Sequence, residues 1–293
     1  KAPADIRKLV QLKLGLITPA KGQKIDEKPF TKAASTLQLF NPVAGKGINR
    51  AKPDSSSPAS FPEKLTDWFE EWMKFRAFTK VMLTYPGGSD GKDTKVLVIA
   101  PKEIRPSALK AIHTELLLKR FYGSIYLDIM MTLTLTKSII VNSEEFKGQA
   151  TGIRLLFKTP KDIIAGFYQT YFKSLGTASA VMNVSFIGMP NWFPVKNSDD
   201  IEAWLALIEE HERCLKSLNE SHSDDVPILL AYRIFLSTGD FMDALKFFAL
   251  YASHFMRKKA LNEWVEPFTT INLGRLFMAD LTIQEIVSNQ GFI

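Results

Sequence analysis

The sequence predicts an α+β fold, with a mixed α/β amino-terminal part that contains a short β-hairpin sheet, followed by a carboxyl-terminal helical bundle. Two short apolar runs, 81–85 and 95–99, flank the connection Pro-Gly-Gly-Ser-Asp-Gly-Lys-Asp, a composition typical of a hairpin turn. From residue 160 onward, apolar residues recur mainly at helical spacing. We therefore place a basic α+β domain at 1–158, which we expect to be incomplete because the chain starts without methionine, and a helical bundle at 159–293.

The segment before the hairpin is basic and weakly patterned. Residues 9–17 fit either a strand or a short helix, 35–40 alternate like a strand, and 53–59 have the composition of a flexible linker. Ser60 and Glu63 then have the spacing of a capping box. Apolar residues on one helical face follow them: Leu65, Trp68, Phe69, Trp72 and Met73. The two tryptophans could stack on nucleobases, but this spacing favours core packing.

Beyond the hairpin, Pro106 opens a helix in which His113 sits beside the apolar face. Because His113 has no partner at metal-ligand spacing, we expect it to be structural. Residues 125–141 are apolar and rich in threonine and β-branched residues, a composition that leaves both helix and strand open. Residues 153–157 are typical of a short strand.

The carboxyl-terminal half is predicted to be helical at 163–172, 198–218, 227–236, 240–256, 266–278 and 282–289. Ser198 is the expected cap of the second of these helices, with acidic residues in the first turn where the helix dipole favours negative charge. His211 lies on the apolar seam of the same helix, so we expect it to be packed or to face a partner rather than to act in catalysis. Residues 217–225 are expected to form an exposed connection.

Composition places the chain among ordinary soluble globular proteins, with 46 % apolar and 23 % charged residues in 293. The single cysteine, Cys214, excludes an internal disulfide and a cysteine-based metal cluster, and it suits a reducing cytoplasm. The longest uncharged run, 174–195, contains glycine, asparagine and proline and is too polar for lipid. We therefore expect a cytoplasmic protein without a membrane partner.

Charge is distributed unevenly along the chain, although the net charge is only +6. Residues 1–52 hold 11 basic and 3 acidic residues (+8), 199–225 hold 2 basic and 9 acidic residues (−7), and 227–293 hold 6 of each. Such asymmetry is typical of a chain that presents one surface to nucleic acid and another to a protein. The alternative is that both charged blocks are solvated surfaces.

Residues 41–52, read as NPVAGKGINRAK, form the first candidate nucleic-acid-binding segment. It begins with Asn41, and two glycines flank Lys46, so the backbone could approach a phosphate closely while the lysine supplies charge. Asn49, Arg50 and Lys52 follow, without an acidic residue, and the first two could read a base edge. The order of residues differs from a Walker A motif, and a solvated surface loop is the alternative.

A second candidate is the run Arg257, Lys258 and Lys259 at the end of the helix predicted at 240–256. Three cations suit the carboxyl end of a helix, and they could also reach a phosphate backbone.

Local catalytic motifs are absent from the sequence. No two of the four histidines lie within four residues of each other, and neither HExxH nor GxSxG occurs. Adjacent carboxylates on a helix point about 100° apart and do not share a site by themselves. The run His222-Ser-Asp-Asp225 could bind a metal in principle, but a solvated loop is favoured. We predict a protein that is not an enzyme, with no catalytic residues, no metal and no cofactor.

Three stretches together resemble one family: residues 37–52, residues 68–80 leading into the hairpin that ends at 101, and the carboxyl-terminal helices from about 225 to the Ser-Asn-Gln-Gly-Phe run at 288–292. The chain resembles the large subunit of a type I CRISPR surveillance complex (Cascade), and it is most similar to the type I-A and I-B variety.

The resemblance implies a non-catalytic subunit whose amino-terminal domain lies near the 5′ handle of the guide RNA. That domain would read the short protospacer-adjacent motif (PAM) on target double-stranded DNA, with the 41–52 segment as its PAM-proximal contact. The helices at 159–293 would resemble the Cascade small subunits that hold a DNA strand, with residues 257–259 on the backbone. Other Cascade subunits, and a recruited nuclease or transposition protein, would be its protein partners.

Three other functions stay open. A nucleic-acid-binding protein outside CRISPR would bind tightly and in a salt-dependent way on its own. A protein-interaction scaffold would tolerate alanine at Lys46, Arg50 and Lys52. An enzyme built from scattered residues would need a pocket on which His211 or several carboxylates converge.

Overall fold

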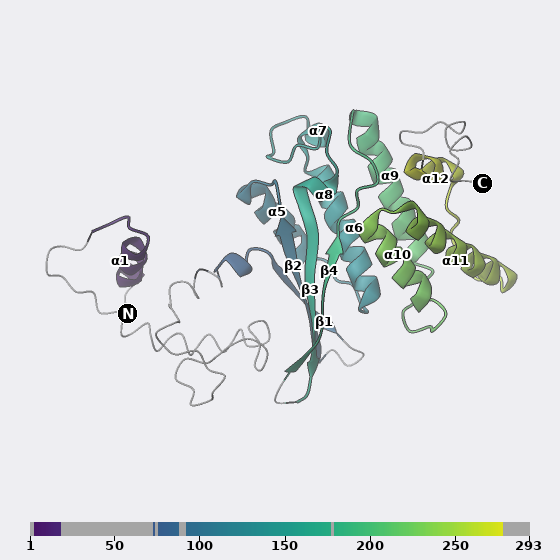
Figure 1. Cartoon of the computed structure of the whole chain (residues 1–293), viewed down its shortest axis with the longest axis horizontal. Coiled ribbons are helices and arrows are strands. Elements are labelled where there is room, and N and C mark those ends of the chain that lie inside the picture. The colour runs from purple at the N-terminus through teal and green to yellow at the C-terminus, as the bar shows by residue number, and fades with distance from the viewer. Residues whose placement is uncertain (1–2, 19–72, 74–75, 88–91, 177–178, 278–293) are drawn as a thin grey trace. The chain divides into compact units, whose positions relative to one another are not determined.

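A computed structural model describes residues 3–18, 73, 76–87, 92–176 and 179–277 (Figure 1). The chain divides into two compact units, Lys1–Lys80 with Phe172–Val181, and Val81–Tyr171 with Met182–Ile293. The first contains α1 (Pro3–Lys13), so the region predicted as strand or helix at 9–17 is helical over its first part. The strand predicted at 35–40, the linker predicted at 53–59 and the helix predicted at 282–289 lie outside the described residues, as does nearly all of the helix predicted to begin at 60.

The fold is a mixed α/β structure with a four-stranded antiparallel sheet in the order β1-β2-β3-β4. The predicted hairpin is confirmed as β1 (Met82–Gly87) and β2 (Asp93–Pro101), in a register that pairs Met82 with Val98 and Tyr85 with Lys95. The turn composition and the alternation of buried and exposed residues along β1 explain the pairing. The other two strands are β3 (Ile164–Ser174) and β4 (Ser179–Gly188).

The helix predicted at 163–172 is wrong, because that segment is strand β3 and only the single turn α8 (Pro160–Ile163) precedes it. Its apolar residues fit helical spacing, but the buried Phe167 and Gln169 flank the exposed Tyr168, which is the period of a strand. The strand predicted at 153–157 is reduced to an isolated bridge between Leu156 and Val195. Strands β3 and β4 therefore lie within the segment 159–293 that was predicted to form a helical bundle.

Helices α5 (Pro106–Leu117) and α6 (Ile125–Val141) follow the hairpin, and α5 begins with the predicted proline. The Tyr85 hydroxyl donates to the carbonyl of Leu116 at 3.2 Å, and Nε2 of His113 lies 2.8 Å from the carbonyl oxygen of Met82, so α5 packs against β1. The ambiguous segment 125–141 is helical. It is apolar on nearly all sides because α5, α9 and α10 surround it.

Helices α9 (Ser198–Leu215), α10 (Val226–Thr238), α11 (Phe241–Ala260) and α12 (Thr270–Phe277) make up the carboxyl-terminal part, after the short α7 (Glu144–Lys147). The cap of α9 is Asn197 rather than Ser198, because its side chain accepts from two backbone N–H groups of the first turn. His211 is buried as predicted, with Nδ1 2.8 Å from the Tyr232 hydroxyl. In the part of the chain that is described, no helix has both the length and the apolar character needed to cross a membrane.

The amino end of α6 is capped from a distant part of the sequence. Ser124 makes no side-chain cap, and the Glu220 carboxylate instead accepts from the backbone N–H groups of Ser124 at 2.9 Å, Ile125 at 2.9 Å and Tyr126 at 3.1 Å. Gly123 makes this approach possible, because a Cβ there would lie 2.6 Å from a Glu220 carboxylate oxygen.

Candidate nucleic-acid interface

The structure describes only one of the two candidate segments. Asn41, Lys46, Asn49, Arg50 and Lys52 lie outside the described residues. Arg257, Lys258 and Lys259 occupy the last turn of α11.

The position of the three cations is set by the residue that caps α11 and by the buried face of that helix. The Asp240 side chain accepts from the N–H groups of Met242 and Asp243 and starts the helix. Buried residues recur at helical spacing and hold one face against the core: Ala244, Phe247, Tyr251 and His254. The last turn extends past this stripe, where positive charge complements the helix dipole.

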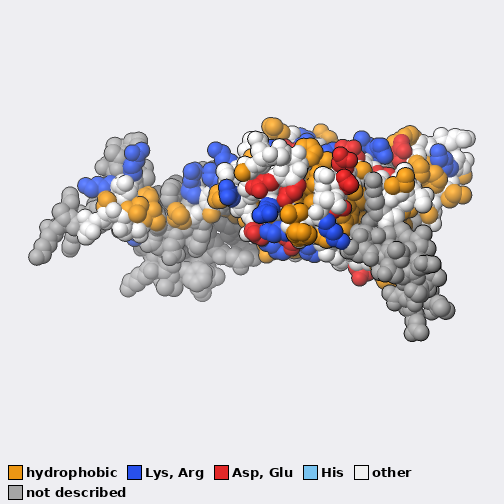
Figure 2. Space-filling view, turned by 90° about the horizontal axis from the view of Figure 1, so that it is seen from above, with side chains coloured by type: hydrophobic (Ala, Val, Ile, Leu, Met, Phe, Trp, Pro, Cys, Tyr) orange, Lys and Arg blue, Asp and Glu red, His pale blue; other side chains and the backbone are white. Residues whose placement is uncertain are grey.

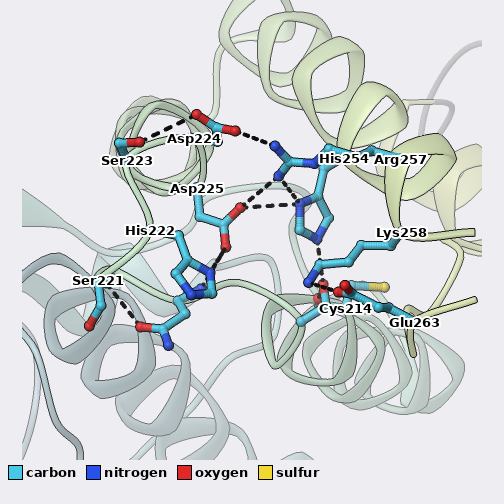
Figure 3. A network of polar contacts seen from close by, with 12 residues as sticks. Cys214, Ser221, His222, Ser223, Asp224, Asp225, His254, Arg257, Lys258 and Glu263 are labelled. Carbon is cyan, nitrogen blue, oxygen red and sulfur yellow. Dashed lines mark hydrogen bonds and ion pairs between the residues drawn. The ribbon is translucent and has the colours of Figure 1, made fainter. Parts of the chain in front are cut away.

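Arg257 is held by two acidic residues from the start of α10 (Figure 3). Its guanidinium group forms an ion pair with Asp224, and its Nη2 donates to Oδ1 of Asp225 at 3.2 Å. Asp225 is only 1 % exposed, so this partner is a buried carboxylate that needs a cation nearby. Arg257 is therefore a structural link between α10 and α11, and most of its charge is neutralised within the chain.

The same carboxylate completes a Ser-His-Asp arrangement. Nδ1 of His254 lies 3.2 Å from Oδ1 of Asp225, and Nε2 of His254 lies 3.2 Å from Oγ of Ser217. The Ser217 hydroxyl donates its only proton to the Cys214 carbonyl at 2.8 Å, and the His254 side chain is completely buried. Burial also lowers the pKa of His254. These contacts link α9, α10 and α11, and the Ser217 proton is directed to the Cys214 carbonyl rather than to His254.

Cys214 lies in the same region. It is fully buried, and burial raises the pKa of its thiol to about 12. In the His222-Ser-Asp-Asp225 run, the Asp225 carboxylate is already paired with Arg257 and His254. Within the described ranges, no group of three or more His, Cys, Asp or Glu side chains is arranged to hold a metal ion.

The remaining two cations differ in their availability. Lys258 forms an ion pair with Glu263 (Figure 3). Lys259 is exposed, its Nζ lies 5.6 Å from the centroid of the Phe255 ring, and no carboxylate among the described residues pairs with it. Of the three predicted contacts at the end of α11, Lys259 is the one that is best placed to bind a phosphate.

A second polar cluster is buried between the sheet, α6 and α10. Lys95 forms an ion pair with Asp128, and Nε of Arg233 donates to Oδ2 of Asp128 at 3.1 Å. Burial lowers the pKa of Lys95 and raises that of Asp128, because it penalises both charged forms. A cavity of about 120 Å³ adjoins this cluster. The Asp128 carboxylate and the nearby Glu220 offset the two cations, so the cluster is balanced internally and does not call for a bound ion.

The surface around these elements is mixed in charge. On the face shown in Figure 2, basic, acidic and apolar side chains alternate over the described surface, with no single continuous basic area. No protein-family model matches this chain, and a search of curated proteins finds no match.

Sequence reasoning missed the acidic partners of Arg257. Asp224 and Asp225 precede it by 33 and 32 residues, and only the antiparallel packing of α10 on α11 brings them to it. The acidic character of 199–225 was visible in the sequence, and it would have suggested that some of this charge neutralises a basic run elsewhere.

Proposed function

We propose that this chain is a non-catalytic, nucleic-acid-binding subunit of a CRISPR RNA-guided DNA surveillance complex, similar to the large subunit of a type I Cascade. The observation that carries the proposal is the combined resemblance of three stretches, 37–52, 68–101 and the helices from about 225 onward. The chain would contribute PAM recognition, contact with the guide 5′ handle and stabilisation of a DNA strand. Its compartment would be the cytoplasm.

The distribution of charge supports this proposal. The net charge of +8 over residues 1–52 includes Lys46, Arg50 and Lys52, which alternate with glycine and asparagine. In guide-directed recognition, base pairing reads most of the sequence, while protein supplies PAM contacts and positive charge along the backbones. A basic segment joined to a structured region fits that division of labour.

The carboxyl-terminal helices would form a bundle that serves as the strand-holding part. In this role Lys259 makes the backbone contact, while Arg257 and Lys258 keep their intramolecular partners.

A protein-interaction scaffold is the second candidate, because β3 and β4 carry exposed apolar side chains on one side. Tyr168 and Phe186 lie next to each other there, with ring centroids 4.9 Å apart. Met182 and Val184 continue this face along β4, and they are 60 % and 68 % exposed. An exposed apolar area of this kind is typical of a protein contact. In the first candidate it would face another subunit of the complex.

Salt-dependent DNA binding tests the proposal. Short duplex and single-stranded DNA are titrated with the purified chain, alone and with the guide RNA and candidate partner subunits. The variant Lys46→Ala/Arg50→Ala/Lys52→Ala should flatten the plot of log K against log salt by roughly one unit for each lost phosphate contact. Sequence preference should appear only in the assembled complex.

The matched control removes the same positive charge elsewhere. Lys110, Lys216 and Lys246 are exposed lysines of the described helices and their ends, and the triple alanine variant at these positions should leave the slope unchanged. Equal slopes for the wild type and the Lys46 triple variant would remove the 41–52 segment from nucleic-acid contact and favour the scaffold. Sequence-specific binding by the chain alone would favour a nucleic-acid-binding protein outside CRISPR.

A further inference from the structure

Phe157 combines two unfavourable features. Its φ angle is 60°, in the left-handed region that a bulky side chain rarely adopts, and it is 75 % exposed to solvent. The ring therefore gains little from burial while its backbone is strained. Strained residues persist where the surrounding structure fixes them, and they gather at functional positions.

The surrounding backbone holds Phe157 firmly in place. Its N–H donates to the Val195 carbonyl at 2.7 Å, and the Val195 N–H donates to the Lys158 carbonyl at 3.0 Å. The N–H of Lys158 donates to the Leu155 carbonyl at 2.7 Å. The Glu145 carboxylate accepts from the N–H groups of Leu155 and Leu156, each at 2.9 Å. The exposed ring is thus presented by a fixed turn.

Two cationic side chains, Arg154 and Lys158, lie in the same turn as Phe157, and the apolar Leu155 between them is buried. Arg154 is exposed and has no side-chain partner within the described part of the chain, and Lys158 is paired with Glu103 at 2.7 Å near its own end of the turn. Lys196 is exposed and follows Val195, the residue to which Phe157 is bonded. The Glu145 carboxylate on α7 is engaged by backbone N–H groups of the turn.

We propose that Phe157 is a stacking site for one unpaired nucleobase of a single-stranded nucleic acid, with Arg154 on a flanking phosphate. Every nucleobase offers an apolar face to an aromatic ring, and nearby cations follow the backbone. An aromatic anchor for a protein would instead lie within a surrounding apolar surface that excludes water. The inference rests on the proposed nucleic-acid function and adds to it a contact that the 41–52 segment and α11 do not provide.

The test compares two labelled single-stranded oligonucleotides of about 12 nucleotides, one intact and one carrying abasic sites, by fluorescence anisotropy with the full chain. Phe157→Ala should weaken binding of the intact strand roughly five- to 100-fold, the effect of losing one stacked base. It should leave the abasic strand unaffected, and Phe157→Trp should retain binding. Phe146→Ala is the matched control, because this substitution also removes a phenyl ring, from a residue on α7 that is 49 % exposed. Both strands should bind the Phe146→Ala variant as they bind the wild type.

Arg154→Ala should weaken the binding of both strands and flatten the slope of log K against log salt by about one unit. This result would separate a phosphate contact from base stacking. Thermal melting of each variant confirms folding. If the wild type binds the intact strand and Phe157→Ala binds it equally well, the stacking site is overturned and the proposed function stands. If Phe157→Ala keeps nucleic-acid binding but fails to join the partner subunits, Phe157 is a protein anchor and the inference is wrong. If the wild type binds neither strand, alone or in the complex, the proposed function falls as well.

Discussion

Lys95 on β2 and Asp128 on α6 form an ion pair in which each side chain is only 3 % exposed. Arg233 on α10 also donates to Asp128, so one carboxylate serves two cations. Breaking a buried pair from one side leaves an uncompensated charge. We expect Asp128→Ala to lower the free energy of unfolding by about 3–5 kcal/mol, measured by chemical denaturation.

The control for that variant is Glu209→Ala, which breaks the exposed ion pair with Lys137. Because water screens that pair, its loss should change the free energy of unfolding by less than about 1 kcal/mol. Similar losses from both variants would show that burial of the Lys95 pair has no special effect.

Close contact between β3 and β4 depends on Gly166. Its φ is 152°, and a Cβ there would lie 1.9 Å from the carbonyl oxygen of Ile187. Gly166→Ala should destabilise the fold by at least about 3 kcal/mol, because the strands must separate to accept the methyl group. Gly148→Ala is the control: its φ is +64° and no atom lies within 4 Å of the added Cβ, so only the backbone term of about 1 kcal/mol applies. A thermal melt that ranks the two variants equally would contradict this account of the β3–β4 contact.

Acid should destabilise the fold through His211. Burial lowers the pKa of His211 to about 3, whereas an unfolded histidine has a pKa near 6.5. Below about pH 6.5, His211 therefore binds a proton in the unfolded state but not in the folded state, and the free energy of unfolding falls as the pH drops. Burial lowers the pKa of His254 as well, which acts in the same direction.

From pH 7 to pH 5, the His211 contribution to the free energy of unfolding should fall by about 2 kcal/mol. His211→Gln should remove this part of the pH dependence, as followed by denaturant titration at each pH. An unchanged profile in His211→Gln would show that another group controls the acid response.

Substitutions at Arg257 and Lys259 should have different effects, the first on stability and the second on nucleic-acid binding. Arg257→Ala leaves the buried Asp225 with fewer partners and should lower the melting temperature, while changing the salt dependence of DNA binding little. Lys259→Ala should leave the melting temperature unchanged and flatten the salt dependence by about one unit. The reverse pattern would assign the phosphate contact to Arg257.

Much of the fold could be predicted from local chemistry. The hairpin follows from its turn composition, and α5 and α11 follow from Pro106 and from the Asp240 cap. Strand β3 was missed because its aromatic and β-branched residues satisfy two periods at once. The glycine at 166, in the middle of an expected helix, was the signal against a helix, since glycine there is unfavourable without a packing reason.

The candidate site was less predictable because its contacts are distant in sequence. The cations of α11 lie together in its last turn, but their unequal availability depends on Asp225 and Glu263. The strained conformation of Phe157 is set by hydrogen bonds to Val195, which no local pattern reveals.

The Glu220 cap of α6 has a consequence for how this protein can vary and be engineered. The polar connection between α9 and α10 resembles a spacer, which would ordinarily tolerate insertion of a tag or a reporter. Glu220 lies within that connection and must reach the α6 N–H groups, so we expect the length of the connection on either side of Glu220 to be constrained. Natural variants should therefore keep the number of residues here while changing their identity, and a fluorescent label is better attached elsewhere on the chain.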